Sequence, residues 1–214
     1  AQDYEQAKYW FQKAAAQGFA KAQYDLGIIY FFGKGIEQDY DQAARWYEKA
    51  AEQGYLDAQY NLAIMYDNGF GVSKDRSKAV KWYRKAAEQG DNQAQYTLAT
   101  RYMHGVGIQK DFKQAVQWLR RAADQENIKA QLDLGVAYHN GFGVRQDEKQ
   151  ALYWYRKAAE QGSSEAQYNL GVMYHYGQGV PQNQSVAKEW FSKACHNGSQ
   201  QGCDAYQKLD QTGY

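Results

Sequence analysis

Four histidines are the first candidates for chemistry, because imidazole is a common metal ligand and general base. His104, His139, His175 and His196 lie far apart in the sequence, although His139 and His175 are separated by 36 residues. Zinc usually takes four ligands, and catalytic zinc sites take three of them from the protein. We therefore predict no metal site and no cofactor, and we interpret the histidines as solvated or helix-end residues.

A second candidate is Ser185-Val186-Ala187-Lys188, which matches the S-x-x-K signature of penicillin-recognising enzymes. That signature works together with S-D-N and K-T-G tripeptides, and neither occurs in this chain. Gly33-Lys34-Gly35 and its copies have the glycine spacing of a phosphate loop, but no strand pattern precedes them, so we interpret them as turns between helices. No nucleophile is paired with a base, and we predict no catalytic residues and no enzyme.

The elements that carry these residues repeat every 36 residues. Tryptophan occurs once in each of six copies, at positions 10, 46, 82, 118, 154 and 190. A second set of positions keeps the same period and comprises Ala22, Leu26 and Tyr30 with their copies up to Ala166, Leu170 and Tyr174. So many positions in register predict a repeat protein.

Each copy is predicted to form two helices. Apolar residues have helical spacing within residues 39–53, and the next helix carries Ala58, Leu62 and Tyr66 before the Gly69-Phe70-Gly71 turn. Gly54 is expected to end the first of these helices in a left-handed conformation. The residues expected to cap the first helix of each pair are Asp39, Asp75, Asp111, Asp147 and Asn183. Neither helix can bury its apolar face alone, so neighbouring repeats must stack.

The pattern resembles the Sel1-like repeat, a relative of the tetratricopeptide repeat. The resemblance rests on Ala58-Gln59-Tyr60-Asn61-Leu62, Gly69-Phe70-Gly71-Val72, Trp82-Tyr83 and Lys85-Ala86-Ala87-Glu88-Gln89-Gly90, and it covers essentially the whole chain. It implies an all-α fold, a right-handed α-solenoid of stacked antiparallel helix hairpins with about six 36-residue repeats. Members of the family mostly act as adaptors or scaffolds in bacterial secretion, host interaction and signalling, or in eukaryotic protein quality control.

We expect residues 1–214 to form a single solenoid that starts within the second helix of a repeat. Residues 183–214 are expected to form a divergent C-terminal capping repeat, because Gly202, Tyr206 and Asp210 stand where other copies have Ala, Leu and Tyr. Glu126 stands where the other copies have glycine. Either Glu126 adopts a left-handed conformation or Asn127 takes over the turn, and we predict an altered or mobile turn there.

The two cysteines, Cys195 and Cys203, both lie in the last copy. Their positions face each other across a short connection, so a disulfide is geometrically feasible. The segment resembles the cysteine-rich secreted bacterial branch of the family, and this resemblance implies a disulfide and a periplasmic or secreted protein. The alternative is a pair of buried free thiols in a cytoplasmic protein.

Two rows of positions on one side of the helices vary between repeats while the framework positions stay fixed. Each row is named after the number of its first residue. Row 25 comprises Asp25, Asn61, Thr97, Asp133 and Asn169. Row 32 comprises Phe32, Asn68, His104, Asn140 and Tyr176. The resemblance implies that this side lines the concave surface of the solenoid. Amides, carboxylates and occasional rings suit an extended peptide, and the alternative is a solvated helix face.

Composition excludes several other classes of protein. The formal net charge is +1, with acidic and basic residues interspersed, so we expect no nucleic-acid partner. No apolar run reaches the roughly 18 residues of a membrane helix, so we expect no membrane insertion. We predict a non-enzymatic, monomeric scaffold or adaptor that binds another protein or an extended peptide on its concave face, in host interaction or signalling. The alternative is a protein that binds or hydrolyses β-lactams or cell-wall fragments.

Overall fold

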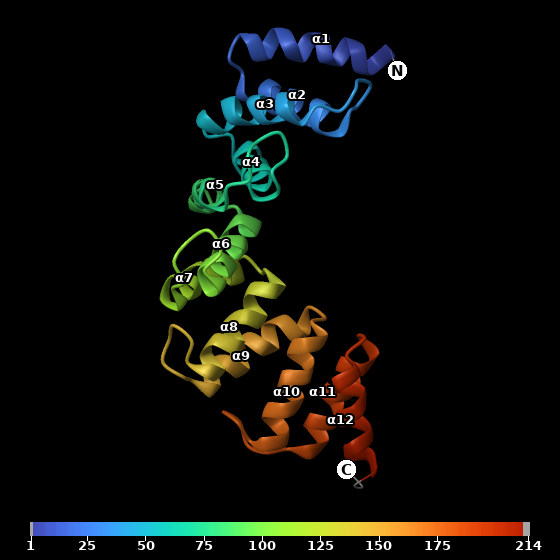
Figure 1. Cartoon of the computed structure of the whole chain (residues 1–214). Coiled ribbons are helices and arrows are strands. Elements are labelled where there is room, and N and C mark those ends of the chain that lie inside the picture. The colour runs from blue at the N-terminus through green and yellow to red at the C-terminus, as the bar shows by residue number, and fades with distance from the viewer. Residues whose placement is uncertain (1, 212–214) are drawn as a thin grey trace. The chain divides into compact units, whose positions relative to one another are not determined.

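The computed structural model describes residues 2–211, and within that range it contains only helices and their connections. Figure 1 shows them following one another as a series of hairpins. The twelve helices of the described range are α1 (Gln2–Ala16), α2 (Ala20–Phe32), α3 (Tyr40–Glu52), α4 (Leu56–Asn68), α5 (Arg76–Glu88), α6 (Asn92–His104), α7 (Phe112–Asp124), α8 (Ile128–Asn140), α9 (Glu148–Glu160), α10 (Ser164–Tyr176), α11 (Gln184–His196) and α12 (Gln200–Gln211). None of these helices is long and apolar enough to cross a membrane.

The helices form two compact units. Unit 1 spans Ala1–Lys110 and unit 2 spans Asp111–Tyr214. Within each unit every helix packs against the next one in sequence, and α12 also contacts α10. The fold is therefore the predicted all-α repeat solenoid, in which contacts are made between neighbouring hairpins. That residues 1–214 act as a single domain stays a prediction.

The odd-numbered helices from α3 onwards begin at the predicted capping residues. The Asp39 carboxylate accepts a hydrogen bond from the backbone N–H of Gln42 at 2.9 Å, and the Asn183 side chain accepts one from that of Val186 at 3.0 Å. The corresponding residues at 75, 111 and 147 cap α5, α7 and α9 in the same way. Each such cap stabilises its helix by about 1 kcal/mol, because it pairs a backbone donor that the helix leaves unpaired.

The long connections after the even-numbered helices pack against the preceding hairpin. Gly69 ends α4 with a φ of 79°. Gly71 has a φ of 61°, and a Cβ atom placed on it would lie 2.0 Å from the backbone oxygen of Tyr40. The second glycine of the turn is therefore required by close approach to the start of α3 as well as by its own conformation.

Small and large residues alternate in the core of each unit. The alanines at 43, 58 and 79 have no exposed surface, nor does Leu62. These small side chains let the helices approach closely, and leucine fills the space between them. The tryptophan position is buried at Trp118 and Trp154, each 8% exposed, and half-buried at 46, 82 and 190. Trp10, on α1, is 65% exposed.

Glu126 adopts the left-handed conformation itself, with a φ of 64°. The alternative, in which Asn127 takes over the turn, is wrong: Asn127 has a φ of −65° and caps α8 by accepting a hydrogen bond from the N–H of Ala130. The amides of Glu126 and Asn127 donate to the end of α7 as those of Gly90 and Asp91 donate to the end of α5. The hydrogen bonds of this turn therefore match those of the turn after α5, and the predicted alteration is not seen in them. The predicted mobility of the turn stays a prediction.

A buried glutamine in each repeat except the last ties successive helices together. Gln59 is 4% exposed; its Nε2 donates to the Ala51 carbonyl at 3.1 Å, and its Oε1 accepts from Gln89 Nε2 at 2.8 Å. One side chain therefore joins α3, α4 and the end of α5. The residues in this position are Gln23, Gln59, Gln95, Gln131 and Gln167, each donating to the carbonyl eight residues before it.

A disulfide takes the place of this hydrogen bond in the last repeat. Cys203 occupies the glutamine position, and Cys195 occupies the position of the residue whose carbonyl accepts. The two form a disulfide across the α11–α12 connection, with the same separation of eight residues. The disulfide is therefore present, as the resemblance implied.

Candidate binding surface

Rows 25 and 32 each place one residue on α2, α4, α6, α8 and α10, but their surroundings differ. Every row 25 residue is half-buried, whereas every row 32 residue is exposed and lies at the C-terminal end of its helix. Phe32 is 62% exposed and Tyr176 is 68% exposed. Row 32 side chains are therefore more exposed to solvent than those of row 25.

Two row 25 residues, Asn61 and Thr97, bond to tyrosines of neighbouring helices, whereas Asp25 pairs with Lys21 of its own helix at 3.1 Å. Asn61 hydrogen-bonds to the hydroxyls of Tyr24 and Tyr47. Burial raises the pKa of both tyrosines, and the hydrogen bond from Asn61 opposes that shift. Thr97 is hydrogen-bonded to Tyr60 in the same way. These residues thus have a structural role, and their contact with a partner stays a prediction.

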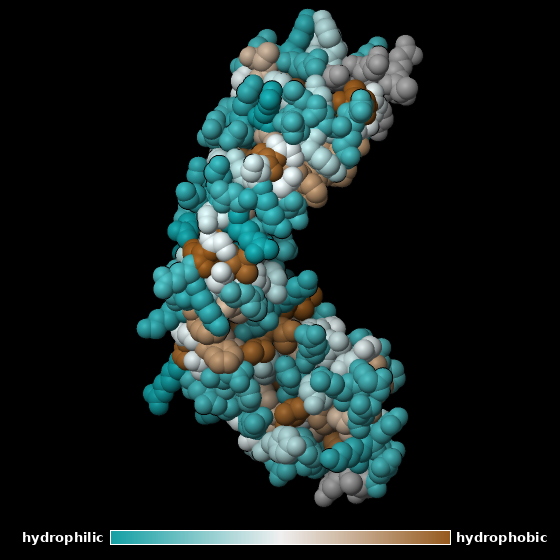
Figure 2. Space-filling view, in the orientation of Figure 1, coloured by the Kyte–Doolittle hydropathy of each residue, from teal (hydrophilic) through white to brown (hydrophobic). Residues whose placement is uncertain are grey.

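Row 32 residues bond mainly within their own helix. Asn68 Nδ2 donates to the Ile64 carbonyl and Asn140 Nδ2 donates to the Val136 carbonyl, each at 2.9 Å. These bonds hold each amide in one orientation and direct its oxygen away from the helix. Row 32 therefore offers oriented amides and exposed rings, which suit the backbone and side chains of a peptide. Most of the molecular surface visible in Figure 2 is hydrophilic, with hydrophobic residues scattered over it.

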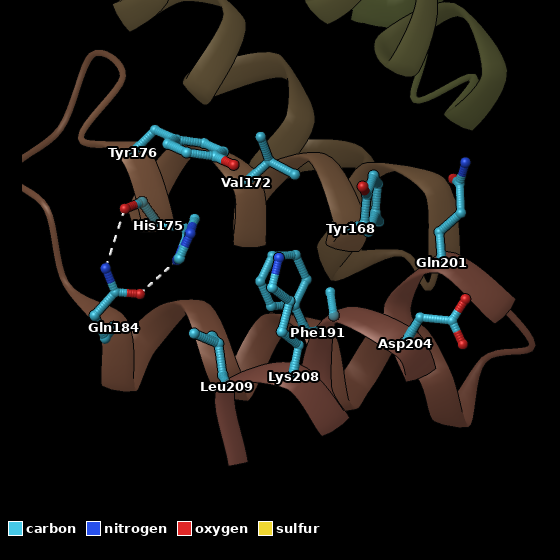
Figure 3. Close-up of a pocket in the computed structure, with 11 residues that line it drawn as sticks. Tyr168, Val172, His175, Tyr176, Gln184, Phe191, Gln201, Asp204, Lys208 and Leu209 are labelled. Carbon is cyan, nitrogen blue, oxygen red and sulfur yellow. Dashed lines mark hydrogen bonds between the residues drawn. The ribbon is translucent and has the colours of Figure 1, made fainter. Parts of the chain in front are cut away.

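A groove of about 620 Å³ lies in unit 2 between α10 and α12, with α11 beneath it. We call it the C-terminal groove. Figure 3 shows Tyr168, Val172 and Tyr176 on one side of it and Gln201, Asp204 and Lys208 on the other. Its remaining lining residues are His175, Gln184, Phe191, Ala205 and Leu209. It contains Tyr176 of row 32, but the rest of it was missed by the sequence reasoning.

The histidines do not come together as a metal site. His175 Nδ1 donates to Gln184 Oε1 at 2.5 Å, and His139 Nδ1 lies 2.9 Å from Glu148 Oε2. Each contact joins the end of one helix to the start of the next. Among residues 2–211, no group of three or more His, Cys, Asp or Glu side chains is placed to hold a metal ion.

The S-x-x-K segment lies at the start of α11. Ser185 is exposed, and Lys188 Nζ forms an ion pair with Asp210 Oδ1 at 2.7 Å. Lys188 Nζ also lies 5.7 Å from the centre of the Tyr206 ring. These contacts attach α11 to α12, which gives Lys188 a structural role.

Sel1 repeat models match almost the entire chain, at residues 1–19, 20–55, 56–91, 92–127, 128–163 and 164–199. No match was found among curated proteins.

Two crystal structures are similar at 38% sequence identity. One is a protective antigen of uropathogenic Escherichia coli strains, with a TM-score of 0.88 over 95% of this chain. This chain spans only 44% of that protein. The other is a Sel1 repeat protein from Oxalobacter formigenes, with a TM-score of 0.81, covering 92% of this chain and 84% of its own. Sel1 repeat proteins are generally scaffolds for protein interactions. On its repeats and its fold, this chain belongs to the Sel1 repeat family.

Proposed function

We propose that this chain is a non-enzymatic scaffold that binds another protein through the row 32 side of its even-numbered helices. The observation that carries the proposal is the difference between the two rows. Row 32 is exposed in every repeat and varies in chemistry, whereas the framework around it repeats. A rigid framework with variable exposed side chains is how repeat proteins adapt one fold to different partners.

The chemistry of row 32 favours an extended segment of the partner. Asn68 and Asn140 are amides that accept and donate hydrogen bonds, as a peptide backbone does. Phe32 and Tyr176 add exposed rings, and aromatic residues contribute large contact areas at interfaces.

The disulfide supports an oxidising compartment, because disulfides persist mainly outside the cytoplasm. Both cysteines of the chain are paired in it. We place the protein in the periplasm or outside the cell, in host interaction or signalling. The description of the Escherichia coli relative as a protective antigen supports this placement.

Partner capture with matched variants tests the proposal. The variant Phe32→Ala, His104→Ala, Tyr176→Ala removes three exposed row 32 side chains while leaving the core intact. The control variant Arg45→Ala, Lys81→Ala, Tyr153→Ala removes three exposed side chains from odd-numbered helices, also one per repeat. Binding to an identified partner should fall at least about 10-fold in the first variant and about 2-fold or less in the control. Equal binding by both variants would contradict the proposed surface.

A thiol titration of protein that has been denatured without reductant tests the compartment. No free thiol before reduction and two after it are expected. Two free thiols in protein exported through an oxidising compartment would contradict the placement.

A further inference from the structure

The C-terminal groove lies where residues that fill the corresponding space between α2 and α4 are replaced. In unit 1, the matching positions of α2, α3 and α4 belong to one packed cluster that includes Phe31, Tyr40, Tyr60 and Ile64. The matching residues in unit 2 are smaller or polar, and they are His175, Gln184, Asp204 and Lys208. The α10–α12 contact therefore lacks much of the bulk found at the matching positions of α2, α3 and α4.

The ring most clearly missing is that of Tyr60. Tyr60 is half-buried on α4 and belongs to the packed cluster, and its hydroxyl reaches Thr97 of α6. Its counterpart on α12 is Asp204, an exposed side chain one turn before Lys208. The packing of Tyr60 thus indicates that an aromatic ring fits between two even-numbered helices at this position.

Two polar groups at the rim, those of Tyr168 and Lys208, are the relevant ones for binding. The position of Asn61, which bonds to Tyr24 in unit 1, is Ala205 in unit 2, so the hydroxyl of Tyr168 loses the corresponding partner. Lys208 forms no ion pair with any residue in the range 2–211, and Figure 3 shows its side chain directed from α12 towards α10. The Asp204 carboxylate accepts a hydrogen bond from Gln200 Nε2 at 2.8 Å. The groove therefore combines an apolar floor with a free ammonium group.

Resting on the scaffold function proposed above, we infer that the C-terminal groove binds an aromatic side chain from an extended segment of the partner protein. An acidic side chain next to that ring contacts Lys208. The ring packs on Val172 and Ala205, above Phe191 and Leu209. The floor is apolar, as an aromatic side chain requires, and the ammonium group complements a carboxylate.

The probe is a pentapeptide with blocked ends, a central tyrosine and a glutamate on each side of it. It is titrated to low-millimolar concentration against the isotope-labelled full chain by NMR. Amide shifts are expected in α10 and α12. Replacing the peptide's tyrosine by alanine should weaken binding at least about 10-fold. Shifts outside these helices, or no shifts, would overturn the inference.

Two variants on α12 make the test specific. Asp204→Tyr introduces the ring that Tyr60 supplies on α4, fills the groove and should weaken binding at least about 10-fold. Gln207→Tyr places the same ring at an exposed position of α12 outside the groove and should leave binding unchanged. Circular dichroism checks that both variants fold. Equal affinity of these two variants for the peptide would overturn the inference.

The charge is tested separately. Lys208→Gln should weaken binding about 3- to 10-fold, and the remaining affinity should depend less on salt. A peptide that ends in tyrosine, with a free terminal carboxylate and no glutamate, should bind more weakly than the blocked peptide. Tighter binding of that peptide would overturn the proposed contact between an acidic side chain and Lys208. Wild-type dimerisation in sedimentation that Asp204→Tyr abolishes would assign the groove to a second copy instead.

The experiments distinguish failure of the groove inference from failure of the proposed scaffold function. If the peptide does not bind but row 32 variants lose the partner, the groove inference falls and the scaffold function stands. If the peptide binds and row 32 variants keep the partner, the proposed surface falls and the groove inference stands.

Discussion

In the last repeat a disulfide replaces the buried glutamine hydrogen bond of the other repeats. We therefore predict that the disulfide and the hydrogen bond are interchangeable. Cys195→Ala with Cys203→Gln should rebuild the glutamine hydrogen bond of the other repeats, because these are the residue types at 159 and 167. Cys195→Ala with Cys203→Ala removes the disulfide and adds nothing, and serves as the reference. Both variants remove the same covalent link, so their difference isolates the new hydrogen bond.

The expected magnitudes follow from the eight-residue separation. Closing so short a loop stabilises the last hairpin by about 2.5 kcal/mol in the chain-entropy model. A buried amide hydrogen bond contributes about 1 kcal/mol. Because stability in a stacked repeat is local, the loss should appear mainly as opening of α12.

Native-state hydrogen exchange of the α12 amides is the assay. Protection should fall about 70-fold in the double-alanine variant relative to wild type, since about 2.5 kcal/mol is lost. The Ala, Gln variant should recover about 5-fold of that loss, which corresponds to about 1 kcal/mol. Amides of α2 should be unchanged in both variants.

The reverse exchange is a control at an internal repeat. Ala159→Cys with Gln167→Cys should form a disulfide under oxidising conditions, because these positions correspond to those of Cys195 and Cys203. The equivalence would be refuted if the two cysteine-free variants showed equal protection of α12 and the Ala159→Cys, Gln167→Cys variant kept two free thiols.

Three further predictions concern the backbone and the buried tyrosines. Glu126→Gly should raise the free energy of unfolding by about 0.5–1 kcal/mol, because a side chain at a φ of 64° is strained; a lower urea midpoint would contradict this. Gly71→Ala should cost at least about 2 kcal/mol, because its Cβ would lie 2.0 Å from a backbone oxygen. Gly54→Ala, with nothing within 4 Å of the new Cβ, should cost only about 1 kcal/mol of backbone strain, and equal losses would contradict the packing argument. Burial raises the pKa of Tyr155, so its contribution to stability is complete below the unfolded-state pKa of about 10 and falls as the pH rises further. Urea unfolding between pH 10 and 11 should therefore show wild type losing about 1 kcal/mol more than Tyr155→Phe, and parallel losses would contradict the burial effect.

The parts of the fold that were predicted from sequence depend on local chemistry. Asp39 caps α3 and Gly69 ends α4 because a short acceptor side chain and a residue without Cβ suit those positions in any helix. The remaining helices could be predicted from the repeat, because each position could be compared with its copies in the other repeats.

The parts that were missed depend on contacts between helices. Gln59 is polar in sequence, and its burial follows from a carbonyl on α3 and a second glutamine on α5. Its signal was a glutamine at the same position of every repeat but the last, within an apolar stripe. The hydrogen bonds of Asn61 to tyrosines of α2 and α3 were likewise not predicted, and its contact with a partner stays a prediction.

The C-terminal groove was missed for a related reason. The prediction of a divergent capping repeat rested on Gly202, Tyr206 and Asp210, and did not consider that Asp204 and Lys208 stand where α4 has Tyr60 and Ile64. The space left by a missing side chain becomes visible only when both helices that border it are placed.

Site-specific photocrosslinking tests the central claim, the row 32 binding surface, most directly. A benzophenone amino acid is introduced at Asn68, and in a second protein at Lys81, an equally exposed position on α5. The proposed surface predicts crosslinks to the partner from Asn68 and few from Lys81, with the crosslinked partner peptides mapping to one extended segment. Crosslinks from Lys81 with none from Asn68 would contradict it and would place the partner on the odd-numbered helices.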